Sequence, residues 1–187
     1  ARPHLLAWTG ETVTLDGSLS WSKTGKIDKY EWTCTDGKTA TGPTFERTYE
    51  KAGSYSEILK VTDAKGNVDY DFAVVQILEK DAPLPPTIHP AYWPTLDIHP
   101  GDPVTFLVRT FRTTDGEETW DFGDGSKPVT VKSDGNVEPH AKDGYARTTH
   151  RFEKPGEYIV TVTRTNNEGQ TAVGRLHVRV EAIPAQE

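Results

Sequence analysis

The side chains that most often carry out catalysis are present in this sequence, but their spacing forms no catalytic pattern. The six histidines are scattered, and none has a partner at the i, i+4 spacing of a helix. The single cysteine, Cys34, has no neighbour in the sequence that could act as its base. Motifs of the GxSxG, HExxH, phosphate-binding-loop and EF-hand types are absent. We therefore expect no catalytic residue and no enzyme activity in this chain.

Composition narrows the classes of protein further. The chain has 187 residues, a formal net charge of −7 and no basic run, which disfavours binding to nucleic acid. One cysteine cannot form an internal disulfide framework or a CxxC metal site. No stretch approaches the roughly 18 apolar residues of a membrane span, and no leader pattern stands at the start. Because the sequence starts at Ala1 and contains no methionine, we expect a processed piece of a longer protein.

Two related halves are the main feature of the sequence. Residues 10–15 (GETVTL) correspond to 101–106 (GDPVTF), residues 32–37 (WTCTDG) to 120–125 (WDFGDG), and residues 49–55 (YEKAGSY) to 152–158 (FEKPGEY). From the tryptophan to the next aromatic residue of the pattern there are 17 residues in the first copy and 32 in the second. The sequence therefore predicts two copies of one structural unit, with a 15-residue insertion in the second copy around Pro128 to Tyr145.

Prolines mark the boundary between the two copies. Seven of the 13 prolines lie between residues 83 and 103. Proline stiffens an extended chain and cannot donate a hydrogen bond to a sheet. We predict a first domain over residues 1–80, a proline-rich connector over 81–100, and a second domain that carries the insertion over 101–187.

Alternating side chains predict strands in both copies. Residues 158–163 and 176–180 alternate in the way that places one face of a strand in a core and the other in water. The residues between them, Asn166 to Gly169, suit a hairpin turn, and residues 63–67 form a similar turn in the first copy. No stretch keeps a 3.6-residue period, so we expect an all-β protein with almost no helix.

The motifs of the second copy resemble those of a known family. The run WDFGDGS at residues 120–126, followed by HRFEKPGEY at 150–158, is similar to the signature of the polycystic kidney disease (PKD) domain. The first copy keeps the tryptophan and the Asp-Gly pair but has Thr33-Cys34-Thr35 where the family has Asp-Phe-Gly. The resemblance implies two tandem immunoglobulin-like (PKD-type) β-sandwiches. In bacteria and archaea such domains are commonly appended to secreted proteases, chitinases and other polysaccharide-degrading enzymes.

Several residues of these motifs have an expected structural role. A tryptophan on one face of a strand fills the centre of a sandwich, and the aspartate of an Asp-Gly turn accepts backbone hydrogen bonds. We predict core or turn roles for Trp32, Trp120, Asp36, Asp124, Tyr55 and Tyr158.

Two charged residues interrupt the alternation. Glu57 stands where the second copy has Val160, and Arg164 stands where the first copy has Val61. A buried charge must be paired or lie near an opening. We expect both side chains to reach solvent, or alternatively to form a polar contact between the domains.

The resemblance makes calcium a cofactor to consider, because some members of the family bind it near the loop before the WDFGDG strand. The first copy has Lys23 and Thr24 in that loop, where acidic ligands would be expected. The second copy has Asp115, Glu117 and Glu118 there, and Ca²⁺ requires several oxygen ligands. We expect no cofactor, and these three residues are the candidates if calcium binds.

Four aromatic residues lie outside the repeated core positions, namely Trp8, Trp21, Tyr92 and Trp93. Sugar rings stack on flat aromatic faces, so exposed residues of this kind would indicate carbohydrate binding. Alternatively, Tyr92 and Trp93 attach the connector to a domain. The inserted segment from Val131 to Arg147 is a further candidate for a contact loop.

The sequence thus predicts a non-catalytic accessory tandem of a secreted, cell-surface or periplasmic microbial protein. Its expected role is to space and orient a neighbouring catalytic or surface domain, with protein contact as an addition. Two alternatives stay open: a carbohydrate-binding module with a polysaccharide partner, and a module for homotypic cell-surface adhesion.

Overall fold

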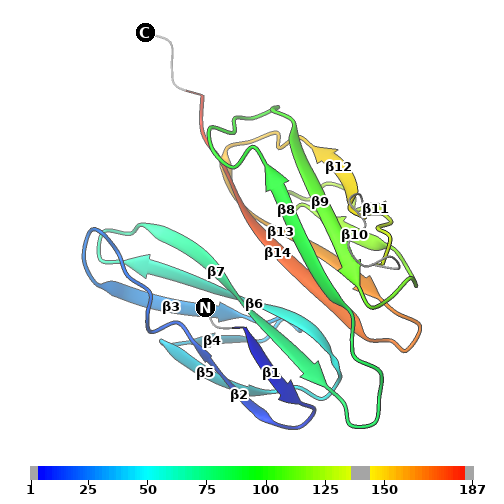
Figure 1. Ribbon diagram of the computed structural model, residues 1–187. Coiled ribbons are helices and arrows are strands. Elements are labelled where there is room, and N and C mark those ends of the chain that lie inside the picture. Colours follow the sequence, from blue (N-terminus) through cyan, green and yellow to red (C-terminus); the bar gives the residue numbers. More distant parts are fainter. Residues whose placement is uncertain (1–3, 136–143, 184–187) are drawn as a thin grey trace. The chain divides into compact units, whose positions relative to one another are not determined.

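The computed structural model describes residues 4–135 and 144–183, and these residues form fourteen strands and no helix (Figure 1). The chain divides into two units, Ala1–Pro85 and Pro86–Glu187. Among the described residues no helix is long and apolar enough to cross a membrane. The prediction of an all-β fold is confirmed.

The first unit is a sandwich of two sheets. The larger sheet contains, in this order, β1 (Leu5–Trp8), β7 (Val68–Leu78), β6 (Gly53–Asp63), β3 (Ile27–Thr33) and β4 (Thr39–Thr41). The smaller sheet pairs β2 (Thr12–Asp16) with β5 (Thr44–Thr48). Strand β1 runs parallel to β7, and the other pairs are antiparallel. The core between the sheets is built on Val13, Leu15, Trp32, Tyr49, Leu59, Ala73, Val75 and Ile77.

The second unit repeats this plan. One sheet contains β14 (Thr171–Val180), β13 (Gly156–Thr165), β10 (Glu118–Asp121) and β11 (Val129–Val131). The other contains β12 (Ala146–His150), β9 (Val104–Phe111) and β8 (Thr87–Trp93). Strands β9 to β14 therefore correspond to β2 to β7. The core contains Ile98, Val104, Phe106, Val108, Trp120, Phe122, Phe152, Val160, Val162, Val178 and Val180.

The first strand has a different place in the two units. Strand β1 belongs to the larger sheet of the first unit, whereas β8 pairs with β9 in the smaller sheet of the second. Residues 81–100, expected to form a connector, thus contain a strand of the second unit. Pro90 is tolerated there because β8 is an edge strand, where a missing N–H breaks no ladder.

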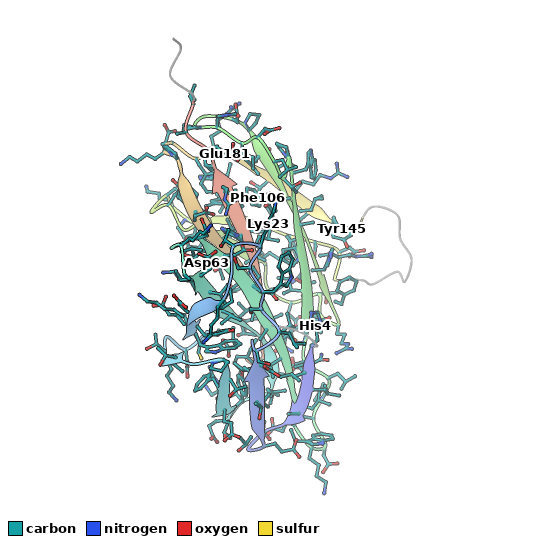
Figure 2. The ribbon with its side chains drawn as sticks, turned by 90° about the vertical axis from the view of Figure 1, so that its left-hand side faces the viewer. His4, Lys23, Asp63, Phe106, Tyr145 and Glu181 are labelled. Atoms are coloured by element: carbon teal, nitrogen blue, oxygen red, sulfur yellow. The ribbon has the colours of Figure 1, made fainter. Side chains whose placement is uncertain are left out.

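The insertion lies between β11 and β12, where the first unit has only Gly42 and Pro43 between β4 and β5. Residues 136–143 of the insertion lie outside the described residues. Before them, Asp134 accepts two hydrogen bonds from Arg109 on β9, at 2.9 and 2.7 Å. The amide of Asp134 also donates to the carbonyl oxygen of Gly144 at 3.1 Å. This cross-link holds the two ends of the insertion together, close to Tyr145, which Figure 2 labels.

Candidate functional site

The predicted structural tryptophans and tyrosines have the same role in both units. Trp32 and Trp120 are buried in the sandwich centres. The hydroxyl groups of Tyr55 and Tyr158 each donate to the carbonyl oxygen four residues earlier, both at 2.8 Å. These four side chains are therefore occupied in packing and in fixing the start of β6 and β13.

The turn after each tryptophan strand is fixed by an aspartate. Asp36 and Asp124 each accept a hydrogen bond from the amide two residues later, at 3.2 and 3.0 Å. Asp36 also pairs with Arg47 at 3.2 Å, and Asp124 pairs with His150 at 2.7 Å. Burial alone would raise the pKa of Asp124, but its hydrogen bonds with Ser126 and His150 outweigh burial and lower the pKa.

Glu57 lies inside the first unit with its side chain fully buried. One carboxylate oxygen accepts from the hydroxyl of Tyr49 and lies 2.9 Å from the guanidinium of Arg47. The other accepts from the amide and hydroxyl of Thr35, at 2.6 and 3.0 Å. Burial, and secondly the charge of Glu57, raise the pKa of Tyr49 well above its usual range.

Arg164 is the corresponding charged residue inside the second unit. Its guanidinium lies 2.8 Å from the carboxylate of Glu118, and both side chains are fully buried. Glu118 also accepts from the hydroxyl of Thr110 at 2.7 Å and from the amide of Ser133 at 2.9 Å. Burial would raise the pKa of Glu118, but the hydrogen bonds from Ser133, Thr110 and Arg164 outweigh it and lower the pKa.

The expectation that Glu57 and Arg164 reach solvent or join the two domains is wrong. Each charge is neutralised inside its own unit by an opposite charge from another strand or loop. Because both oxygens of Glu118 accept hydrogen bonds in the core, this residue does not fit the role of a calcium ligand.

The remaining calcium candidates lie in the loop before β10. A carboxylate oxygen of Asp115 accepts from the amide of Asn167 at 3.2 Å, and Glu117 is exposed. Within residues 4–135 and 144–183, no three His, Cys, Asp or Glu side chains come together as a group that could hold a metal ion.

The four aromatic candidates fall into two classes. Trp21, Trp8 and Trp93 are 81%, 48% and 44% exposed, respectively. Tyr92 instead points inward, where its ring stacks on Phe106 at 5.9 Å and its hydroxyl donates to the carbonyl oxygen of His177 at 2.7 Å. Tyr92 therefore serves packing, while the three tryptophans offer accessible aromatic faces.

Trp21 borders a surface hollow of the first unit. The hollow has a volume of about 290 Å³ and is lined by Ser20, Trp21, Leu59, Val61, Asp69, Tyr70 and Asp71. One of its lining residues, Leu59, belongs to the core of the sandwich. We call this feature the Trp21 hollow.

The loop that carries Trp21 is held by Asp63 at the end of β6. The hydroxyl groups of Ser22 and Thr24 donate to one carboxylate oxygen, and the amides of Lys65 and Asn67 donate to the other at 2.9 Å. Hydrogen bonds from Asn67, Thr24 and Ser22 lower the pKa of Asp63 well below its usual range. Figure 2 shows Lys23, within this loop, near Asp63.

The sequence analysis missed Arg47 and the two aspartates of the Trp21 hollow. Arg47 has a signal, because the repeat aligns it with His150, and each pairs with the turn aspartate of its unit. The alignment of the two copies gives no comparable signal for Asp69 and Asp71, because their place in the lining of the hollow depends on how the strands of the unit are arranged.

Comparison with known proteins agrees with the resemblance. A family model described as PKD domain matches residues 2–77, and a second with the same description matches residues 91–182. Collagenase ColA of Clostridium perfringens is 31% identical over 74 residues, which are 40% of this chain and 7% of that protein. The chain thus spans only a small part of this relative.

Among solved structures, the fibronectin(III)-like modules of Clostridium thermocellum CbhA are 13% identical, with a TM-score of 0.36 over 96% of this chain and 90% of that one. The D0-D1 domain of Intimin is 14% identical, with a TM-score of 0.41 over 93% and 94% of the two chains. The assignment rests on the two family models, which together span most of both units. The chain belongs to the PKD domain family and carries two copies of the domain in tandem.

Proposed function

We propose that this chain is a non-catalytic accessory segment of a secreted or surface-exposed microbial protein, where it spaces and orients a neighbouring module. The observation that carries the proposal is the pair of PKD domains, one after the other, in a chain similar to a short part of a much longer collagenase. The neighbouring module would be an enzyme that degrades protein or polysaccharide.

The interior of both units supports this role. The buried charges of Glu57 and Glu118 are paired with arginine and satisfied by hydrogen bonds. Both carboxylates are engaged inside the fold by these partners and are not exposed for proton transfer to a substrate. The exposed loops and edges are then available to contact other parts of the protein.

The purified chain should not hydrolyse denatured collagen or soluble polysaccharides, and it should act only through a partner. Fused to a collagenase catalytic domain, it should raise the rate on insoluble collagen above that of a fusion with a Gly/Ser linker of equal span. Rates on a short soluble peptide should be equal for the two fusions. Equal rates on insoluble substrate would contradict the spacer role, and hydrolysis that co-purifies with the chain alone would contradict the non-catalytic role.

A carbohydrate-binding function is the second candidate, because Trp21, Trp8 and Trp93 are exposed. An indole ring offers a large apolar face on which a sugar ring can stack without a deep cleft. The inward direction of Tyr92 removes it from this candidate surface.

If the tryptophans bind glycans, the chain should be retarded in native gels that contain a soluble analogue of an insoluble polysaccharide, such as hydroxyethyl cellulose or glycol chitin. Trp21→Ala should reduce the retardation most, because Trp21 is the most exposed of the three. Trp21→Phe keeps an aromatic face and should retain part of it. Mobility that is unchanged across a panel of neutral and charged polysaccharides would exclude this function.

A further inference from the structure

The small sheet of the second unit has an outer face that is directed away from the core. Along β9 the side chain of Phe106 is buried, so its neighbours Thr105 and Leu107 face outward. Trp93 on β8 lies opposite Thr105, and Thr149 on β12 lies opposite the same residue on the other side. We call this outer face, which is formed by alternate residues of β8, β9 and β12, the Trp93 face.

A cluster of aromatic and charged side chains occupies one end of the Trp93 face. The guanidinium of Arg109 lies over the rings of Phe111 and Tyr145, 5.5 and 5.9 Å from their centroids. The same guanidinium is paired with Asp134 at 2.7 Å. The hydroxyl of Tyr145, a residue labelled in Figure 2, lies 3.1 Å from Nδ1 of His89. These contacts hold the Tyr145 ring in place and neutralise the charge of Arg109 within the cluster.

The other end of the Trp93 face is an exposed indole beside a low apolar surface. Trp93 is 44% exposed, and the next outward-facing pair, Ala91 opposite Leu107, is partly exposed. The hydroxyl groups of Thr105 and Thr149 lie next to this apolar surface. The outward-facing residues of β8, β9 and β12, three fully described strands, include no carboxylate. The face therefore combines aromatic rings and hydroxyl groups on a flat sheet.

The corresponding face of the first unit has a different chemistry. The repeat aligns β2 with β9 and β5 with β12, so that Asp16 and Glu46 correspond to Leu107 and Thr149. The outward-facing residues of β2 and β5 are all threonine, aspartate or glutamate, and all are exposed. Strand β2 ends at Asp16, so the cluster around Arg109 lies beyond the aligned part. Because this fold accepts a fully polar outer face, the apolar face of the second unit indicates an interaction site.

The size of the Trp93 face selects the class of ligand. Strands about 4.8 Å apart, and outward-facing residues about 6.7 Å apart along β8 and β9, give a platform of about 10 by 20 Å. A stable protein interface buries about 800 Å² on each partner, which is about four times this area. The platform is thus too small for a stable protein partner, whereas its length suits a few linked sugar rings.

We propose that the Trp93 face binds a chain of an uncharged polysaccharide, with Trp93 and Tyr145 as stacking positions near its two ends. The C–H groups of a sugar ring pack on the face of an indole or phenol ring, and threonine hydroxyls can exchange hydrogen bonds with sugar hydroxyls. An uncharged polymer is favoured because Arg109 is neutralised by Asp134 and the three strands present no outward carboxylate. This inference rests on the carbohydrate-binding candidate function and gives it a site in the second unit, apart from Trp21.

The test uses the native-gel measurement in the Trp21→Ala chain, which lacks the most exposed tryptophan of the first unit. With hydroxyethyl cellulose and glycol chitin as the probes, Trp93→Ala in this background should weaken the apparent binding at least about fivefold, which corresponds to about 1 kcal/mol. Trp93→Tyr keeps an aromatic ring and should lose less than Trp93→Ala. Retardation that is equal with and without Trp93, or that vanishes in the Trp21→Ala chain alone, would overturn the proposal.

Exchanging the chemistry of the two faces gives a matched pair of variants. In the same background, Leu107→Asp/Thr149→Glu gives the Trp93 face the carboxylates of the first unit and should abolish the remaining retardation. Glu46→Leu adds a leucine to the corresponding face of the first unit and should leave the retardation unchanged, whereas an increase would indicate unspecific apolar adhesion and contradict the proposal. Arg147 is a cation on β12, so alginate serves as an acidic probe. Stronger retardation by alginate than by the uncharged polymers would likewise contradict it.

The outcomes separate this proposal from the proposed functions. If no polymer retards the wild-type chain, carbohydrate binding and the Trp93 face both fail. If the wild type is retarded and the Trp93 variants are retarded equally, only the face fails. Circular dichroism verifies the fold of each variant, and the comparison of Trp93→Ala with Trp93→Tyr decides if the double variant does not fold. The spacer role is tested by the fusions and is independent of these results.

Discussion

Arg164→Met is expected to destabilise the second unit by about 3–5 kcal/mol, because it leaves the carboxylate of Glu118 buried without its cation. The double variant Glu118→Leu/Arg164→Met should recover most of this loss, since it removes both charges together. One nitrogen of Arg164, Nη2, has no hydrogen-bond partner among the described residues, so the wild-type pair is itself imperfectly satisfied. The first unit shows that an apolar solution exists, because Val61 and Tyr30 occupy the two equivalent positions there.

Hydrogen exchange read by mass spectrometry distinguishes the two units, because peptides from β13 and β14 report on the second and those from β6 and β7 on the first. Only the second unit should lose protection in Arg164→Met. A loss below about 1 kcal/mol, the range of an exposed ion pair, would show that the pair is solvated and contradict its burial.

The same pair makes the second unit sensitive to acid. The pKa of Glu118 is lowered in the folded state, so the stabilisation it provides is complete above the ordinary glutamate value of 4.5. This stabilisation is lost as the pH falls below 4.5 and through the lower folded pKa. The double variant should therefore lose less stability than the wild type between neutral pH and pH 3.

Trp32→Ala and Trp120→Ala should each cost their unit about 3–5 kcal/mol, the range measured when a large buried aromatic residue is truncated. Both rings fill sandwich centres. Trp120 packs against Phe106 and Phe122, with ring centroids 5.3 and 6.2 Å away. Urea unfolding followed by circular dichroism, with the exchange measurement to assign the unit, gives the free energies of unfolding.

Phenylalanine variants serve as the matched control for the two tryptophans. The indole N–H of Trp32 donates to the carbonyl oxygen of Gly42 at 3.0 Å, whereas that of Trp120 has no acceptor among the described residues. Trp32→Phe should therefore cost about 1 kcal/mol more than Trp120→Phe. A smaller cost for Trp32→Phe would mean that this hydrogen bond does not stabilise the first unit.

The repeat made the architecture predictable. Two copies of one motif set, with alternating apolar residues, are enough to indicate two β-sandwiches and to place Trp32 and Trp120 in their centres. The insertion could be located because the spacing between aligned aromatic residues differs between the copies. These features are local in sequence or follow from comparison of the copies.

The buried ion pairs could not be predicted in the same way. Alternation correctly placed Glu57 and Arg164 on inward-facing positions, but their partners come from elements that are far away in the sequence. Glu118, for example, is 46 residues from Arg164, and Ser133 reaches both from the insertion. A period-two pattern indicates the direction of a side chain and contains no information about what it meets.

The position of the first strand in each unit could also not be predicted from the sequence. Proline enrichment indicated a connector over residues 81–100, yet an edge strand accepts proline without losing a hydrogen bond, so the composition of a connector and of β8 is similar. Consequently the Trp93 face, to which β8 contributes Trp93 and His89, could not be assembled from the sequence.

The cross-link at the base of the insertion gives the second unit a natural site for grafting foreign peptides. Arg109 on β9 fixes Asp134, and the amide of Asp134 donates to the carbonyl oxygen of Gly144, so the two ends of the segment are held together by described residues. Doubling the length of a closed loop costs only about 0.6 kcal/mol in entropy. The first unit joins the equivalent strands through Gly42 and Pro43 and would not tolerate such an exchange as readily.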